Sequence, residues 1–162
     1  MQERPPVTLS SRLQTDLTAA IRDRDELRRD TLRMAIAAAY NTQKAARREL
    51  TDDEVLTVLT REVKTRRESI EAFSAAGRAE AAAKEQAEVE ILSGYLPQQL
   101  TGEEIDALVK ETVDEVGASS PRDMGKVMAA LTQKTRGRAD GKAVSAAVAR
   151  ELAARDLAGH GH

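Results

Sequence analysis

Two capping boxes, at Thr51–Glu54 and Thr101–Glu104, do most to limit what this chain can fold into. In a capping box the threonine hydroxyl accepts a hydrogen bond from the backbone N–H three residues later, and the glutamate reaches back to the threonine N–H. The first box is followed by Val55, Leu59 and Val63, which have the spacing of one face of a helix. Alternating apolar and polar residues, the pattern of a strand, are almost absent. The sequence therefore predicts an all-α protein.

Seven helices are expected, and a break divides them into two groups. Gly94 and Pro97 interrupt the helical pattern. Four helices that form long hairpins precede the break, and they cover about Leu9–Ile21, Asp25–Arg48, Thr51–Gly77 and Arg78–Ser93. The second has two adjacent apolar lines, one of Leu27, Met34 and Ala38 and one of Leu32, Ala35, Ile36 and Ala39. Three shorter helices follow it, and their expected N-caps are Thr101, Ser120 and Asp140.

These boundaries predict two domains. We expect an N-terminal domain of about four helices over residues 9–96 and a small three-helix domain over residues 97–157. A disordered tail over residues 1–8 and a second tail over residues 158–162 flank them.

Composition excludes several classes of protein. The chain has no Cys, which rules out disulfides, thiolate metal ligands and a cysteine nucleophile, and which fits a reducing compartment. No stretch approaches the ~20 apolar residues of a membrane span. The first nine residues lack the apolar segment of a secretory signal. We therefore expect a cytoplasmic protein that does not contact a membrane.

No group of residues predicts an active site. The two histidines, His160 and His162, lie in the C-terminal tail with no third metal ligand near them. Carboxylates such as Glu103 and Glu104 gather at helix starts, where negative charge stabilises the helix. No phosphate-binding glycine loop or dinucleotide motif is present. We expect no catalytic residue, no metal site and no cofactor.

Charge is segregated along the C-terminal domain. Residues 98–117 contain six acids and one lysine, whereas residues 122–150 contain seven basic residues and two acids. The whole chain carries only −2, so the second segment is a local positive excess, which is typical of a surface that binds an anion. Its candidate phosphate contacts are Arg122, Lys126, Lys134, Arg136, Arg138 and Lys142.

Gly125 lies inside the helix that Ser120 and Pro121 open. A glycine there costs ~1 kcal/mol relative to alanine. Either another backbone packs against Gly125 or the backbone of a ligand approaches it, and the sequence leaves both explanations open. Lys126 follows near the free amides of the first turn, a suitable place for a phosphate. Gly125 therefore joins the candidate binding site.

Five segments occur in order across nearly the whole chain, and YLPQQL and DMGKVM are the most specific parts of them. They are TLRMAIAAA (Thr31–Ala39), LTREVKTRRESIEAF (Leu59–Phe73), YLPQQLTGEEI (Tyr95–Ile105), VGASSPRDMGKVM (Val116–Met128) and GRADGKAV (Gly137–Val144). Together they resemble the YqeY-like proteins of the GatB/YqeY family.

The resemblance implies an N-terminal helical domain and a three-helix domain similar to the tail of the B subunit of the glutamine-dependent tRNA amidotransferase, which helps to hold tRNA. Free-standing relatives are commonly labelled carbon–nitrogen ligases with glutamine as amido-N-donor. This chain contains no ATP-binding motif and neither the catalytic cradle nor the amidase of that enzyme. We therefore expect the label to be inherited from the larger enzyme, and the chain not to be an independent enzyme.

The sequence and the resemblance together predict an accessory protein that binds tRNA or another structured RNA through the basic C-terminal domain. Scarce aromatic residues favour folded RNA over single strands, because single strands are usually read by stacking on aromatic rings. Two alternatives stay open. One is a protein-interaction module that docks on the translation machinery, and the other is a subunit or regulator of tRNA-dependent amido transfer.

Overall fold

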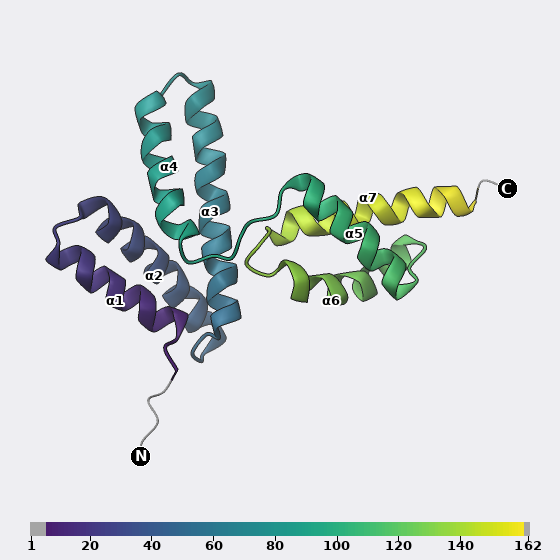
Figure 1. The fold of residues 1–162 in the computed structure, drawn as a ribbon, viewed down its shortest axis with the longest axis horizontal. Helices are drawn as coiled ribbons and strands as arrows, with labels where there is room; N and C mark the ends of the chain where they lie inside the picture. The colour runs from purple at the N-terminus through teal and green to yellow at the C-terminus, as the bar shows by residue number, and fades with distance from the viewer. Residues whose placement is uncertain (1–5, 161–162) are drawn as a thin grey trace, which may run out of the picture. The chain divides into compact units, whose positions relative to one another are not determined.

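The computed structural model describes residues 6–160, and within this range every regular element is a helix (Figure 1). The helices are α1 (Leu9–Arg22), α2 (Glu26–Ala46), α3 (Asp52–Ala75), α4 (Ala79–Ser93), α5 (Gly102–Val116), α6 (Met124–Thr135) and α7 (Gly141–Gly159), with the 3-10 turn η1 (Pro121–Asp123) before α6. The all-α fold predicted from the sequence is confirmed for the described residues.

The chain divides into two compact units. The N-terminal unit, Met1–Pro97, contains α1 to α4, and the C-terminal unit, Gln98–His162, contains α5 to α7. Of the two expected tails, residues 1–5 and 161–162 lie outside the described residues. Helix α7 extends to Gly159, two residues beyond the expected end of the second domain.

The helices begin where their capping residues indicate. The Thr51 and Thr101 hydroxyls each accept from the N–H of the glutamate three residues later, at 3.2 and 3.1 Å, and both capping boxes are complete. Ser120 opens a third box, with Asp123 as its acid, but this box caps η1 and not the α-helix, and α6 itself begins at Met124. At α1 the Thr8 hydroxyl accepts from the Ser11 N–H at 3.1 Å, so Thr8 is the N-cap. These contacts are local, which is why the sequence predicts them.

The N-terminal unit consists of two helical hairpins. Helices α1 and α2 form one, and α3 and α4 run side by side as the other (Figure 1). Leucine and valine side chains fill the core where the hairpins pack, and the fully buried members include Leu13, Leu32, Val55, Leu59 and Leu92.

Only one of the two apolar lines predicted for α2 is buried. Leu27 and Met34 are 36% and 54% exposed, so the expectation that their line faces the core is wrong. Leu32 and Ala35 of the other line are buried as expected, together with Thr31. At about 100° per residue, Leu27 and Met34 lie roughly a quarter-turn from Ala35 and fall at the edge of the contact face. The buried Thr31 hydroxyl is satisfied because it donates to the Leu27 carbonyl at 2.8 Å.

The C-terminal unit packs three helices around one small core. Each helix contributes valine or leucine side chains to it, and its fully buried members include Val109, Val113, Val127, Leu131, Val148 and Leu152. No helix within residues 6–160 is long and apolar enough to cross a bilayer.

Candidate nucleic-acid interface

The start of α6 presents two cations to solvent. Arg122 lies in η1 and Lys126 in the first turn of α6, and both side chains are exposed. The turn that carries them is held by Asp123, which accepts from the N–H groups of Ser119 and Ser120 at 2.9 and 3.3 Å. These two bonds lower the pKa of Asp123, and the charge of Lys126 adds to the effect. Neither Arg122 nor Lys126 makes an ion pair within residues 6–160.

Gly125, between them, faces open space. A Cβ placed on Gly125 would meet no other atom within 4 Å. The explanation that another backbone packs against Gly125 is therefore excluded for this unit. Of the two explanations, the approach of a ligand is the one that stays a prediction.

Lys134 is bound to α5, the helix that contains the six acids of residues 98–117. Its Nζ lies 2.9 Å from a carboxylate oxygen of Glu115 and 3.4 Å from the Thr112 hydroxyl, both on α5. Arg150 and Arg155 of α7 make similar pairs with Asp106 and Asp114 of α5, at 3.4 and 2.6 Å. Charges that are segregated along the sequence are thus paired across the helices, and part of the local positive excess is neutralised.

Arg138 holds the fold at the connection between α6 and α7. Its Nε donates to the Gln98 carbonyl at 3.2 Å, while its own carbonyl accepts from the Leu100 N–H at 2.8 Å. Next to it the Gly137 carbonyl accepts from the Gln99 side-chain amide at 2.6 Å. The segment Gln98–Leu100 is therefore fastened to this connection. Arg138 thus has a structural function that the local sequence does not indicate.

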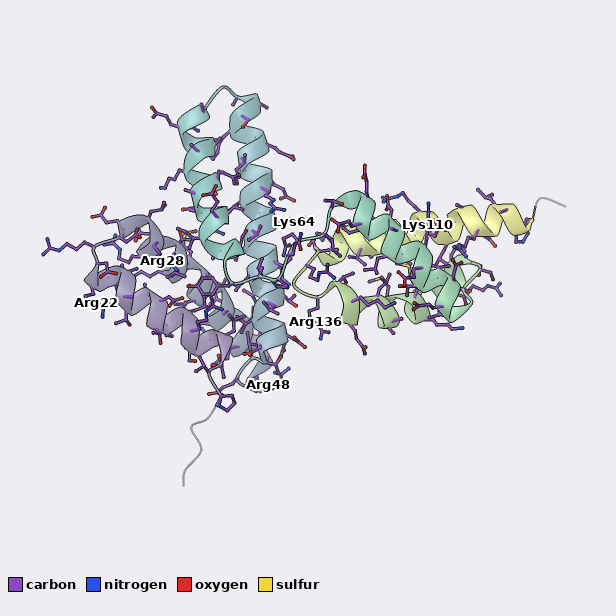
Figure 2. The ribbon with its side chains drawn as sticks, in the orientation of Figure 1. Arg22, Arg28, Arg48, Lys64, Lys110 and Arg136 are labelled. Carbon is purple, nitrogen blue, oxygen red and sulfur yellow. The ribbon has the colours of Figure 1, made fainter. Side chains whose placement is uncertain are left out.

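The last two candidates lie on either side of Arg138. Arg136 follows α6 directly and is exposed (Figure 2). Lys142 is in the first turn of α7, which Asp140 caps by accepting from the Ala143 N–H at 3.2 Å. Lys142 is exposed and has no ion-pair partner in the described part of the chain.

The seven candidate residues form two groups rather than one site. Arg122, Gly125 and Lys126 are at the start of α6, while Lys134, Arg136, Arg138 and Lys142 are near its end. Helix α6 has 12 residues, so it spans about 18 Å at 1.5 Å per residue. A single small anion cannot touch both groups, whereas successive phosphates of a nucleic acid can.

A cavity of about 400 Å³ between α1 and α2 is lined mainly by neutral side chains, among them Gln14, Tyr40 and Gln43. No group of three or more His, Cys, Asp or Glu residues within residues 6–160 could hold a metal ion. His160 contacts Asp156, one turn earlier on α7, and His162 lies outside the described residues.

Comparison with known proteins identifies the family. The sequence model of the family described as Yqey-like protein matches residues 10–152. The chain belongs to the YqeY-like family. The match covers both units, and the resemblance of the five segments is therefore confirmed.

Two fungal relatives of this YqeY-like chain share the name "Altered inheritance of mitochondria protein 41, mitochondrial". The relative from Pyrenophora tritici-repentis is 35% identical over 132 residues, which cover 78% of this chain and 73% of the relative. The relative from Lachancea thermotolerans is 32% identical over 112 residues, which cover 67% of this chain and 60% of the relative. The shared name states a mitochondrial location for those proteins and no reaction.

Proposed function

We propose that this YqeY-like chain is an accessory protein that binds tRNA or another structured RNA through its C-terminal unit. The observation that supports the proposal most is that three of the candidate cations, Arg122, Lys126 and Lys142, are exposed and have no ion-pair partner among the described residues. Cations that are not neutralised within the molecule are the ones able to bind phosphates and release counterions.

Each candidate residue has a separate part in this proposal. Arg122 and Lys126 bind phosphates at the start of α6, and the open space around Gly125 lets an RNA backbone come close. Arg136 and Lys142 bind phosphates at the other end of α6. Lys134 and Arg138 mainly hold the fold, because their side chains are already bonded within the unit.

A charge-reversal experiment tests the proposal. Total tRNA is titrated with the full chain at low salt in a filter-binding assay, and the double variant Lys126→Glu and Lys142→Glu is compared with the unaltered chain. We expect the affinity of the double variant to fall by about tenfold or more, because two phosphate contacts are lost and two repulsions are added.

The matched control is Lys110→Glu, which reverses an exposed lysine of the same unit on the acidic helix α5 (Figure 2). It changes the net charge by half as much as the double variant does, so an effect of net charge alone would give it about half the loss of log affinity. We expect the loss to be much less than half, and no binding by the unaltered chain would refute the proposal.

The two alternatives expected from the sequence stay predictions. A partner from the translation machinery or an amidotransferase would be retained by the chain after ribonuclease treatment. The family label of carbon–nitrogen ligase would require glutaminase or transamidation activity that disappears when the chain is omitted.

The cytoplasmic location expected from the sequence stays a prediction.

A further inference from the structure

Two helix ends of the N-terminal unit contain an arginine in the left-handed backbone region. Arg24 has a φ of 56° and Arg47 a φ of 58°, and they are the only residues other than glycine with positive φ within residues 6–160. In this region Cβ comes too close to the following carbonyl oxygen, so every residue with a side chain is disfavoured relative to glycine.

The turns themselves do not require arginine. After α1, the N–H of Arg24 donates to the Ile21 carbonyl at 3.2 Å and the next N–H donates to the Ala20 carbonyl at 3.0 Å, which is a Schellman motif. Helices α3 and α5 end in turns of the same kind with glycine at the left-handed position, Gly77 and Gly117.

Helix α2 ends in a simpler turn. The Arg47 N–H donates to the Gln43 carbonyl at 2.9 Å, and Arg47 itself is left-handed. A glycine would satisfy this turn and the one at Arg24 with less strain.

The arginine side chains gain nothing within the fold that would offset this strain. Both are exposed, and neither makes a hydrogen bond or an ion pair with its side chain in the described part of the chain. The dipoles of α1 and α2 favour a cation in the last turn, but Arg22 and Lys44 already supply one there. Arg24 also comes just before the start of α2, where the dipole disfavours positive charge.

The two positions are far apart on the unit. Helix α2 separates them, and its 21 residues span about 31 Å at 1.5 Å per residue. Figure 2 labels Arg22, the last residue of α1 and two residues before Arg24, and Arg48, the residue after Arg47. A small anion cannot reach both positions, whereas an extended polyanion can.

We propose that Arg24 and Arg47 are RNA phosphate contacts on the N-terminal unit, retained at the expense of the stability of that unit. A guanidinium presents a planar fork of donors that matches a phosphate. The proposal rests on the RNA-binding function proposed above, and it extends the binding surface beyond the C-terminal unit.

The test combines stability with RNA binding in the same variants. In the double variant Arg24→Gly and Arg47→Gly the strain disappears, so we expect the melting temperature to rise by a few degrees. The affinity for total tRNA should fall, and the slope of log K against log salt should become shallower by about 2, or about 1 per phosphate contact. The double lysine variant keeps the charge and the strain, so it should keep both the slope and the melting temperature.

A third protein controls for loss of charge. Arg33→Gln removes one exposed positive charge from α2, and it should change the slope by less than half of the change in the double glycine variant.

Three results would overturn the inference. A lower melting temperature of the double glycine variant would mean that the arginines stabilise the fold. An unchanged salt slope, in a chain whose binding is weakened by Lys126→Glu and Lys142→Glu, would refute the inference and leave the proposed function standing. If the unaltered chain does not bind tRNA, the proposed function fails and this inference fails with it.

Discussion

The Tyr95 hydroxyl donates a hydrogen bond to the Asp16 carboxylate, and this bond joins the end of α4 to α1. Tyr95 is only 7% exposed, and the Arg12 guanidinium lies 4.8 Å from the centre of its ring. Tyr95 begins the YLPQQL segment, whose Gln99 is bonded in the C-terminal unit. The most specific segment of the sequence therefore has a structural role in both units.

The first prediction concerns this bond. Tyr95→Phe keeps the ring and removes the hydroxyl, so it should lower the free energy of unfolding by about 1 to 2 kcal/mol in urea denaturation. The control is Tyr40→Phe. Tyr40 is 58% exposed and is the only other tyrosine of the chain, so its change should be within about 0.5 kcal/mol. Equal losses in the two variants would contradict this role of Tyr95.

The second prediction concerns high pH. Burial, together with the bond to Asp16, raises the pKa of Tyr95 from 10.0 to about 12. The unfolded chain therefore loses this proton at a lower pH than the folded chain does, and stability should fall as the pH rises from 10 to 12. The stability difference between the unaltered chain and Tyr95→Phe, measured by denaturation at several pH values, should shrink over that interval. A constant difference would show that Tyr95 titrates normally.

The third prediction concerns Arg66 of α3, which is only 4% exposed and lies against α4. Its guanidinium lies 2.8 Å from Glu62, and its Nε lies 3.3 Å from Glu88, close enough for an ion pair but not aligned as a hydrogen bond. Glu88→Gln should cost about 2 to 3 kcal/mol of unfolding free energy, because a buried cation then loses one of two partners.

Its control is an exposed pair on the same helix. Lys64 and Glu68 lie 3.9 Å apart, and Glu68→Gln should cost no more than about 0.5 kcal/mol. If both glutamine variants unfold at the same denaturant concentration, burial does not strengthen the Arg66 pair.

The fourth prediction concerns two glycines of the C-terminal unit. A methyl group added at either Gly125 or Gly117 would lie in open space, but Gly117 has a φ of 68° while Gly125 does not have positive φ. Gly125→Ala should raise the free energy of unfolding by about 0.5 kcal/mol, whereas Gly117→Ala should lower it by about 1 kcal/mol.

Measurement of tRNA binding tests the remaining explanation of Gly125, the approach of a ligand. If an RNA backbone approaches this position, Gly125→Ala should weaken tRNA binding several-fold while it stabilises the fold. Unchanged binding would remove Gly125 from the interface.

Local features could be predicted from the sequence because they depend on neighbours in the chain. The capping boxes at Thr51 and Thr101 and the caps at Ser120 and Asp140 form as expected, since each involves residues within a few positions. The spacing of apolar residues along the sequence also predicts where the helices lie. This spacing does not determine which side of a helix is buried when apolar residues cover a broad arc, which is why the prediction for Leu27 and Met34 is wrong.

Long-range pairing could not be predicted. Arg66 belongs to a run of charged residues that resembles a solvated face, yet α4 covers it. Lys134 and Arg138 belong to a positive stretch of sequence, yet Glu115 and the Gln98 carbonyl bind them. In each case the partner is about twenty or more residues away, and only the packing of the helices brings the two together.

The most direct test of RNA binding is to follow the backbone amide signals of the full chain by NMR while unlabelled tRNA is added. We predict that the signals of Arg122, Gly125, Lys126 and Lys142 shift or broaden first, and that those of the acidic helix α5 change least. Changes centred on α5, or none at low salt, would contradict RNA binding through these residues.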